Sequence, residues 1–130
     1  MDKYDELAPL TDAQFEVMQA LWTRGEASLG DVWTDVSNRR PLAKNTVQTL
    51  LSRLVDKGWV ATRQDGKAFV YHAVKGQGAA RRQLLRRVLD AAFQGSTEGL
   101  VMALLEDRDI SDEEAARLKQ IIEEAGRASQ

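Results

Sequence analysis

Two short runs of strand-forming residues, separated by an Asp-Gly pair, place the tightest constraint on the fold of this chain. Residues 59–64 (WVATRQ) and 67–74 (KAFVYHAV) are rich in β-branched and aromatic side chains, and Asp65-Gly66 lies between them. An Asp-Gly pair at such a place favours a two-residue type I′ turn, in which both central residues need a positive φ. The sequence therefore predicts a β-hairpin over residues 59–74, with Asp65 and Gly66 at its turn.

Three helix patterns precede this hairpin. The first opens at Thr11, which with Gln14 has the spacing of a capping box, and it stops at Gly25. The second has Ser28 as its N-cap, and the third covers residues 43–57. In each segment apolar residues recur every three or four positions, which is typical of a helix that covers a core. These residues are Phe15, Met18, Leu21 and Trp22, then Leu29, Val32, Trp33 and Val36, then Val47, Leu50, Leu51, Leu54 and Val55.

Helix, helix, helix and hairpin is the element order of a winged helix-turn-helix. We therefore expect a mostly α fold with a small β-hairpin wing, in which residues 1–76 form a DNA-binding domain. Residues 77–130 contain three more helix patterns, with Ser96 and the Ser111/Glu114 pair as N-terminal caps. These short helices are too few to enclose a core alone, so we expect them to form a dimerisation domain with a second copy of the chain. The candidate dimer contacts are Leu85, Leu89, Phe93, Leu100, Leu104, Leu118, Ile121 and Ile122.

The net charge of −2 conceals an uneven distribution. Residues 1–37 carry a net charge of −6, residues 38–89 carry +10, and residues 90–130 carry −6. A concentrated positive block is the electrostatic footprint of a phosphate-binding surface, and a solvated basic helix face gives the same composition. Four arginines in the block either face DNA or pair with the acidic ends, and the sequence does not choose between these: Arg81, Arg82, Arg86 and Arg87.

The start of the third helix carries side chains that suit a DNA major groove. Its candidate DNA-contacting residues are Lys44, Asn45, Thr46, Gln48, Thr49 and Arg53. The amides of Asn45 and Gln48 can each pair with adenine through two hydrogen bonds, and Lys44 can reach guanine or a phosphate. The two threonine methyl groups can meet a thymine methyl, and Arg53, one turn later, is expected on the phosphate backbone.

Four further basic residues are candidates for phosphate contacts. Arg63 and Lys67 flank the hairpin turn, and Arg39 and Arg40 lie just before the third helix. Contacts of this kind set the register of a protein on DNA without reading its sequence.

Several classes of function are not supported by the residues. The chain has no cysteine, which excludes disulfides and thiolate metal sites, and one histidine, His72, to which no role is assigned. No GxSxG turn or glycine-rich phosphate loop is present, so neither catalysis nor a cofactor or metal ion is expected. Trp22, Trp33 and Trp59 lie on apolar stripes or at a strand start, so core packing is expected for them rather than base stacking.

The location expected from the sequence is the cytoplasm. The longest apolar runs are far shorter than the ~20 residues that cross a bilayer, so no membrane insertion is expected. The first ten residues contain no apolar signal core.

Five segments together resemble the penicillinase and methicillin-resistance repressors. Residues 10–22 look like the first helix of that family, and residues 44–58 are similar to its recognition helix. The other three segments are 66–71 (wing), 93–96 (start of the dimerisation segment) and 111–114 (last helix). The resemblance covers about residues 10–125 and implies a homodimer that binds a dyad-symmetric operator in double-stranded DNA and represses transcription.

The resemblance also implies a route of induction. Members of the family are released through a membrane-bound sensor protease that leads to cleavage at an Asn-Phe pair in the dimerisation segment. The corresponding stretch, residues 100–105 (LVMALL), contains no Asn-Phe pair, so this chain departs from the family at that position. A copper-responsive branch carries a C-terminal cysteine cluster, which a chain without cysteine cannot form.

A winged helix can also serve as a protein-protein interaction module without specific DNA binding. The basic block alone does not separate the two functions. The amide-rich start of the third helix favours DNA, because protein-binding helices more often expose aromatic or aliphatic anchors.

Overall fold

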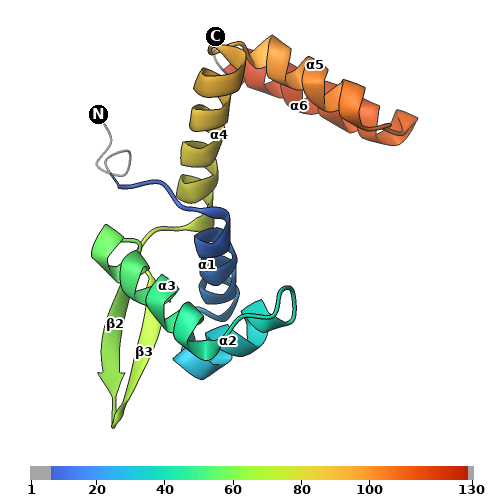
Figure 1. Ribbon diagram of the computed structural model, residues 1–130. Coiled ribbons are helices and arrows are strands. Elements are labelled where there is room, and N and C mark those ends of the chain that lie inside the picture. Colours follow the sequence, from blue (N-terminus) through green and yellow to red (C-terminus); the bar gives the residue numbers. More distant parts are fainter. Residues whose placement is uncertain (1–6, 129–130) are drawn as a thin grey trace. The chain divides into compact units, whose positions relative to one another are not determined.

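The computed structural model describes residues 7–128, which form six helices and a three-stranded sheet and divide into two compact units at Arg87/Val88. The elements, in chain order, are α1 (Asp12–Arg24), β1 (Glu26–Ala27), α2 (Leu29–Ser37), α3 (Lys44–Lys57), β2 (Val60–Asp65), β3 (Ala68–Ala73), α4 (Gln77–Phe93), α5 (Thr97–Asp107) and α6 (Asp112–Ala128). This order confirms the predicted winged helix followed by a helical segment (Figure 1).

The predicted caps fix the ends of the first helices. Thr11 and Gln14 form a complete capping box at α1, in which the Gln14 N–H donates to Thr11 Oγ1 over 3.2 Å and the Thr11 N–H donates to Gln14 Oε1 over 3.0 Å. Ser28 caps α2, and Gly58 ends α3 with a φ of 90°. The left-handed backbone conformation at this position is strained for every residue except glycine, so Gly58 determines where α3 ends.

The core of the first unit lies between α1, α2, α3 and the base of the sheet. The apolar stripes of the three helices meet there, since residues three and four apart share one helix face. Its fully buried large side chains are Val17, Met18, Leu21, Val32, Val36, Val47, Leu51, Leu54 and Trp59.

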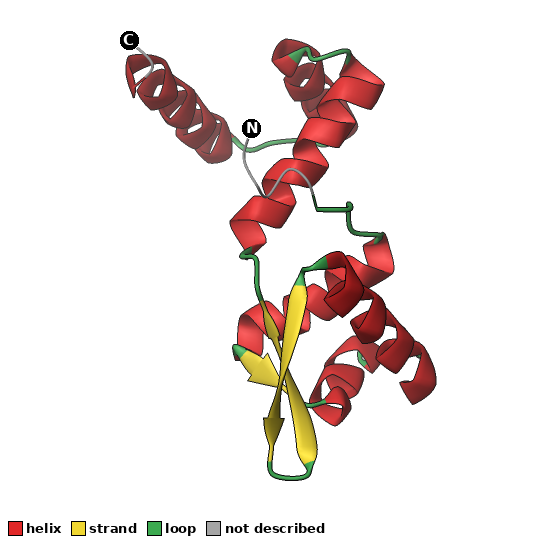
Figure 2. Ribbon diagram, turned by 90° about the vertical axis from the view of Figure 1, so that its left-hand side faces the viewer, coloured by secondary structure: helices red, strands yellow, loops and turns green. Residues whose placement is uncertain are grey.

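The sheet contains one strand that the sequence analysis did not predict. Its order is β1-β3-β2, all antiparallel, because Glu26 and Ala27 pair with His72 and Tyr71 at the open edge of the hairpin. The hairpin β2–β3 projects beyond α1, α2 and α3 of the first unit (Figure 2). Two residues are too few to show the alternation that identifies a strand in a sequence. The strand β1 forms because the unpaired edge of β3 lies beside it and offers free backbone groups.

The hairpin itself is confirmed, but its predicted turn is wrong. Asp65 pairs with Ala68, so the two loop residues are Gly66 and Lys67, one position later than expected. Gly66 has a φ of 66°, and among the described non-glycine residues only Gln94 has a positive φ. A single positive φ at a glycine in the first loop position is the pattern of a type II′ turn, which suits the twist of a hairpin equally well.

Each tryptophan side chain donates its indole N–H to a backbone carbonyl outside its own helix or strand. Trp22 bonds to the carbonyl of Lys75, Trp33 to that of Leu42 and Trp59 to that of Ala8, each over 2.8 Å. Trp22 and Trp59 are the less exposed of the three, and indole N–H groups removed from water need such partners. Each of the three bonds holds a residue outside the helices and strands beside the tryptophan.

The second unit, from Val88 onward, buries very little. Neither α5 nor α6 has a buried residue, and the buried residue of α4 is Ala80, which packs in the core of the first unit. Ser96 and Ser111 accept hydrogen bonds from the N–H groups of Gly99 and Glu114, so both predicted caps are present. None of the described helices is long and apolar enough to cross a membrane.

Candidate nucleic-acid interface

Helix α3 separates a buried face from a polar exposed one. Val47, Leu51 and Leu54 are completely buried against the core. The opposite face exposes all six residues predicted to contact DNA, which are Lys44, Asn45, Thr46, Gln48, Thr49 and Arg53. Since the buried residues fix the rotation of the helix, the same packing that stabilises the unit presents these polar groups to solvent.

The N-terminus of α3 favours the binding of anionic groups. Its N-cap is Ala43, which makes no side-chain cap bond, and the first turn contains Lys44 and no acidic residue. The first N–H groups of a helix point outward with a partial positive charge, which attracts anions. Thr49 donates its hydroxyl to the Asn45 carbonyl over 3.1 Å, so its methyl group is the more available part of that side chain.

Trp33 lies beside the start of α3 and is not in the core, which corrects the expectation from its apolar stripe. Its side chain is 38% exposed, while Trp59 is 1% exposed. The Lys44 Nζ lies 5.8 Å from the centroid of the Trp33 ring, within the range of a cation–π contact. No separate signal marks this position in the sequence, because the apolar stripe of a helix does not show which of its members lies at the edge of the core.

The two basic residues of the wing lie in different surroundings. Arg63 forms a two-point ion pair with Glu26 of β1, with Nε–Oε2 and Nη2–Oε1 distances of 2.5 and 3.0 Å. The hydrogen bonds from Arg63 lower the pKa of the Glu26 carboxyl. Tyr71 packs against the core on one face of the sheet. Because side chains alternate along a strand, the Arg63 side chain lies on the other face, which points away from the core. Lys67 is exposed in the turn.

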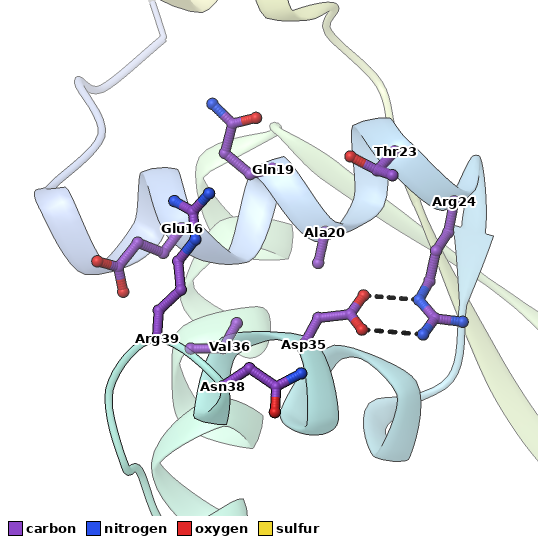
Figure 3. Close-up of a pocket in the computed structure, with 9 residues that line it drawn as sticks. All are labelled: Glu16, Gln19, Ala20, Thr23, Arg24, Asp35, Val36, Asn38 and Arg39. Atoms are coloured by element: carbon purple, nitrogen blue, oxygen red, sulfur yellow. Dashed lines mark hydrogen bonds and ion pairs between the residues drawn. The ribbon is translucent and has the colours of Figure 1, made fainter.

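The two arginines before α3 also differ in their contacts. Arg40 Nη2 forms an ion pair with Glu16 Oε1 of α1 over 2.8 Å. The side chain of Arg39 lies along a groove of about 430 Å³ between α1 and α2, which Arg24 and Asp35 also line with their two hydrogen bonds of 2.6 and 2.9 Å (Figure 3). These contacts direct both arginines toward α1.

The candidate dimer residues are largely exposed. Leu85, Leu104, Leu118, Ile121 and Ile122 are exposed, and Leu89, Phe93 and Leu100 are half-buried. Within residues 7–128, no three His, Cys, Asp or Glu side chains gather closely enough to hold a metal ion.

Comparison with known proteins gives matches along almost the whole chain. A sequence profile of the family described as penicillinase repressor matches residues 10–124. The penicillinase repressor of Bacillus licheniformis is 28% identical over 119 residues, which cover 92% of this chain and 93% of that protein. The transcriptional regulator BlaI of Mycobacterium tuberculosis is 35% identical over 101 residues, which cover 77% of this chain and 71% of that protein.

A solved structure gives a similar result for part of the fold. The monomeric form of the Bacillus licheniformis BlaI, in complex with the blaP half-operator, matches with a TM-score of 0.51 and 27% identity. The match covers 57% of this chain and 90% of that one. The matched family consists of repressors, not enzymes, in agreement with the sequence analysis. This chain belongs to the penicillinase repressor family of transcriptional regulators.

Proposed function

We propose that this chain is a sequence-specific DNA-binding repressor that acts as a homodimer on a dyad-symmetric operator. The observation that carries the proposal is the exposed polar face of α3, on a winged helix whose solved relative binds a half-operator. A helix of this kind fits the major groove, where each base pair presents a distinct set of donors and acceptors.

The roles at the DNA follow from the chemistry of each side chain. Gln48 and Asn45 read adenine through their amides, and Lys44 meets guanine or a phosphate. Arg53 and Lys67 contact phosphates, where they add affinity and fix the register. Arg63 must first exchange or share its ion pair with Glu26, so it contributes less than Lys67 to phosphate binding.

The dimer is supported by the apolar side chains that α4, α5 and α6 leave exposed. Thirteen large hydrophobic residues are exposed in the described chain, and ten of them lie between Leu84 and Ile122. Ten large apolar side chains exposed within one stretch of the sequence are more than a monomeric domain usually leaves in water, and association with a second copy would bury them. Linking two winged helices lets one dimer bind two half-sites, which raises the overall affinity well above that of one half-site.

The proposal is tested by titrating the full chain against labelled DNA from upstream of its own gene, by fluorescence anisotropy at several salt concentrations. Scrambled DNA of the same length and composition is the control. We expect a preference of ~10³ or more for the upstream DNA, with two chains per site and a steep fall of affinity with salt.

Gln48→Ala makes the titration specific to the recognition helix. Loss of one pair of hydrogen bonds to a base should weaken the free energy of binding to the upstream DNA by about 1–3 kcal/mol and leave the affinity for scrambled DNA unchanged. If the wild-type chain binds both DNAs weakly and equally, specific recognition is contradicted and a protein-protein interaction module is favoured instead.

A further inference from the structure

Trp33 connects helix α2 to the segment that leads into the recognition helix. Its indole N–H donates to the Leu42 carbonyl over 2.8 Å, and Leu42 lies two residues before the first residue of α3. The ring of the same side chain lies beside the Lys44 ammonium, 5.8 Å from its centroid. One exposed side chain on α2 therefore contacts both the segment before α3 and the first residue of α3.

The exposure of Trp33 distinguishes it from the other two tryptophans. Trp22 and Trp59 make the same type of indole hydrogen bond from buried or half-buried positions, where burial of the ring explains the choice of residue. Trp33 leaves 38% of its surface in water, and its neighbours Val32 and Val36 fill the core without it. A smaller polar residue would be equally compatible with helix α2 at this exposed position. The contacts of Trp33 with Leu42 and Lys44 therefore explain the presence of a tryptophan better than packing does.

We propose that Trp33 is a positioning residue for operator recognition, which holds Lys44 and the entry to α3 in the arrangement that DNA requires. This inference rests on the proposed function. A lysine side chain has high rotamer entropy, and a free Lys44 would lose that entropy on contacting DNA. A ring that restricts the ammonium beforehand, and a hydrogen bond that fixes the residue before the N-cap, reduce this cost of binding.

The contact between Trp33 and Lys44 also has an electrostatic advantage over an ion pair. A cation–π contact leaves the positive charge of Lys44 intact, whereas an ion pair would neutralise it. Arg40 and Arg63, which are held by Glu16 and Glu26, illustrate the other case. Lys44 is thus restrained without losing its attraction for a phosphate or for a guanine edge.

The experiment is a double-mutant cycle in the full chain. Trp33→Leu removes the ring and the donor, Trp33→Phe keeps a ring without the donor, and each is combined with Lys44→Met. Thr34→Ala is the matched control, because the Thr34 hydroxyl donates to the Gly30 carbonyl within α2. The probe is the upstream DNA fragment with its scrambled counterpart, titrated at several salt concentrations, and thermal unfolding of every variant is recorded.

The expected effects follow from the strength of one hydrogen bond and one exposed cation–π contact. Trp33→Leu should weaken binding to the upstream fragment about tenfold, Trp33→Phe about threefold, and Thr34→Ala not measurably. In the Lys44→Met background, Trp33→Leu should weaken binding by no more than about threefold, because the ring then has no cation to place. Trp33→Leu should also lower the salt dependence of binding, in the same direction as Lys44→Met.

Three outcomes overturn the proposal. If the wild-type chain prefers the upstream fragment and Trp33→Leu binds it equally well, Trp33 has no positioning role and the proposed function stands. An equal loss with and without Lys44 would show that the ring acts by another route, such as direct contact with DNA. If Trp33→Leu fails to fold, Trp33→Phe tests the hydrogen bond to Leu42 by itself: the expected loss is about threefold with or without Lys44, and binding equal to that of the wild type overturns the proposal. A wild-type chain without preference would overturn both the proposed function and this inference.

Discussion

Replacing Ile121 by alanine perturbs the proposed dimer at one of its most exposed apolar side chains. Ile121 is 61% exposed and its neighbour Ile122 is 62% exposed, both on α6. Full burial of an isoleucine side chain is worth about 1.5–3 kcal/mol, so burial of the exposed part of Ile121 is worth about 1–2 kcal/mol per copy. A twofold dimer contains the residue twice, and alanine retains a small part of the contact. The expected loss is therefore about 2–3 kcal/mol per dimer, which raises the dimer dissociation constant about 30- to 140-fold.

Sedimentation equilibrium over a wide range of protein concentrations measures this constant directly. The matched control is Val74→Ala, since Val74 is also aliphatic and 50% exposed but lies in the first unit. We expect the control to dimerise like the wild type, and both variants to keep the helix content and the unfolding temperature of the winged helix.

Two results would refute the reasoning. A wild-type chain that stays monomeric up to the highest concentration would show that α4, α5 and α6 do not associate with a second copy. An Ile121→Ala chain that dimerises as tightly as the wild type would show that this part of α6 lies outside the interface.

Three further predictions concern the winged helix. Gly66→Ala should destabilise the unit by about 1–2 kcal/mol through its positive φ alone, because an added Cβ meets nothing within 4 Å, whereas Gly76→Ala should be neutral; urea unfolding measures both. Glu26→Gln should destabilise the chain at pH 7, where the lowered pKa of Glu26 keeps it ionised beside Arg63. The difference in unfolding free energy, measured with urea, should disappear at pH values below the folded-state pKa of Glu26, where the protonated wild-type carboxyl is as uncharged as the glutamine amide. Trp59→Phe should cost about 2 kcal/mol in the same assay, because the buried ring shrinks and its N–H bond to the main chain is lost.

Much of the fold could be predicted because its signals are local. The capping box at Thr11, the stop at Gly58 and the periodic apolar residues of α3 each depend on neighbours within one or two helical turns. The same periodicity places the candidate DNA-contacting residues, since a helix with Val47 and Leu51 in the core must turn its other face outward. The order of these elements was then enough to predict the winged helix.

The tertiary structure decided those features that depend on residues far apart in the chain. The pairing of β1 needs the free edge of β3, and the register of the hairpin moves the turn by one residue, because strand pairing and not the Asp-Gly pair alone fixes it. The ion pair of Arg63 with Glu26 joins residues 37 positions apart, and it changes the role of a residue that looked available for phosphate contacts. Trp33 shares its stripe with core residues, yet the boundary of the core leaves it exposed beside Lys44. Helical and strand periods are set by the backbone of each segment, whereas these contacts exist only once separate segments have packed together.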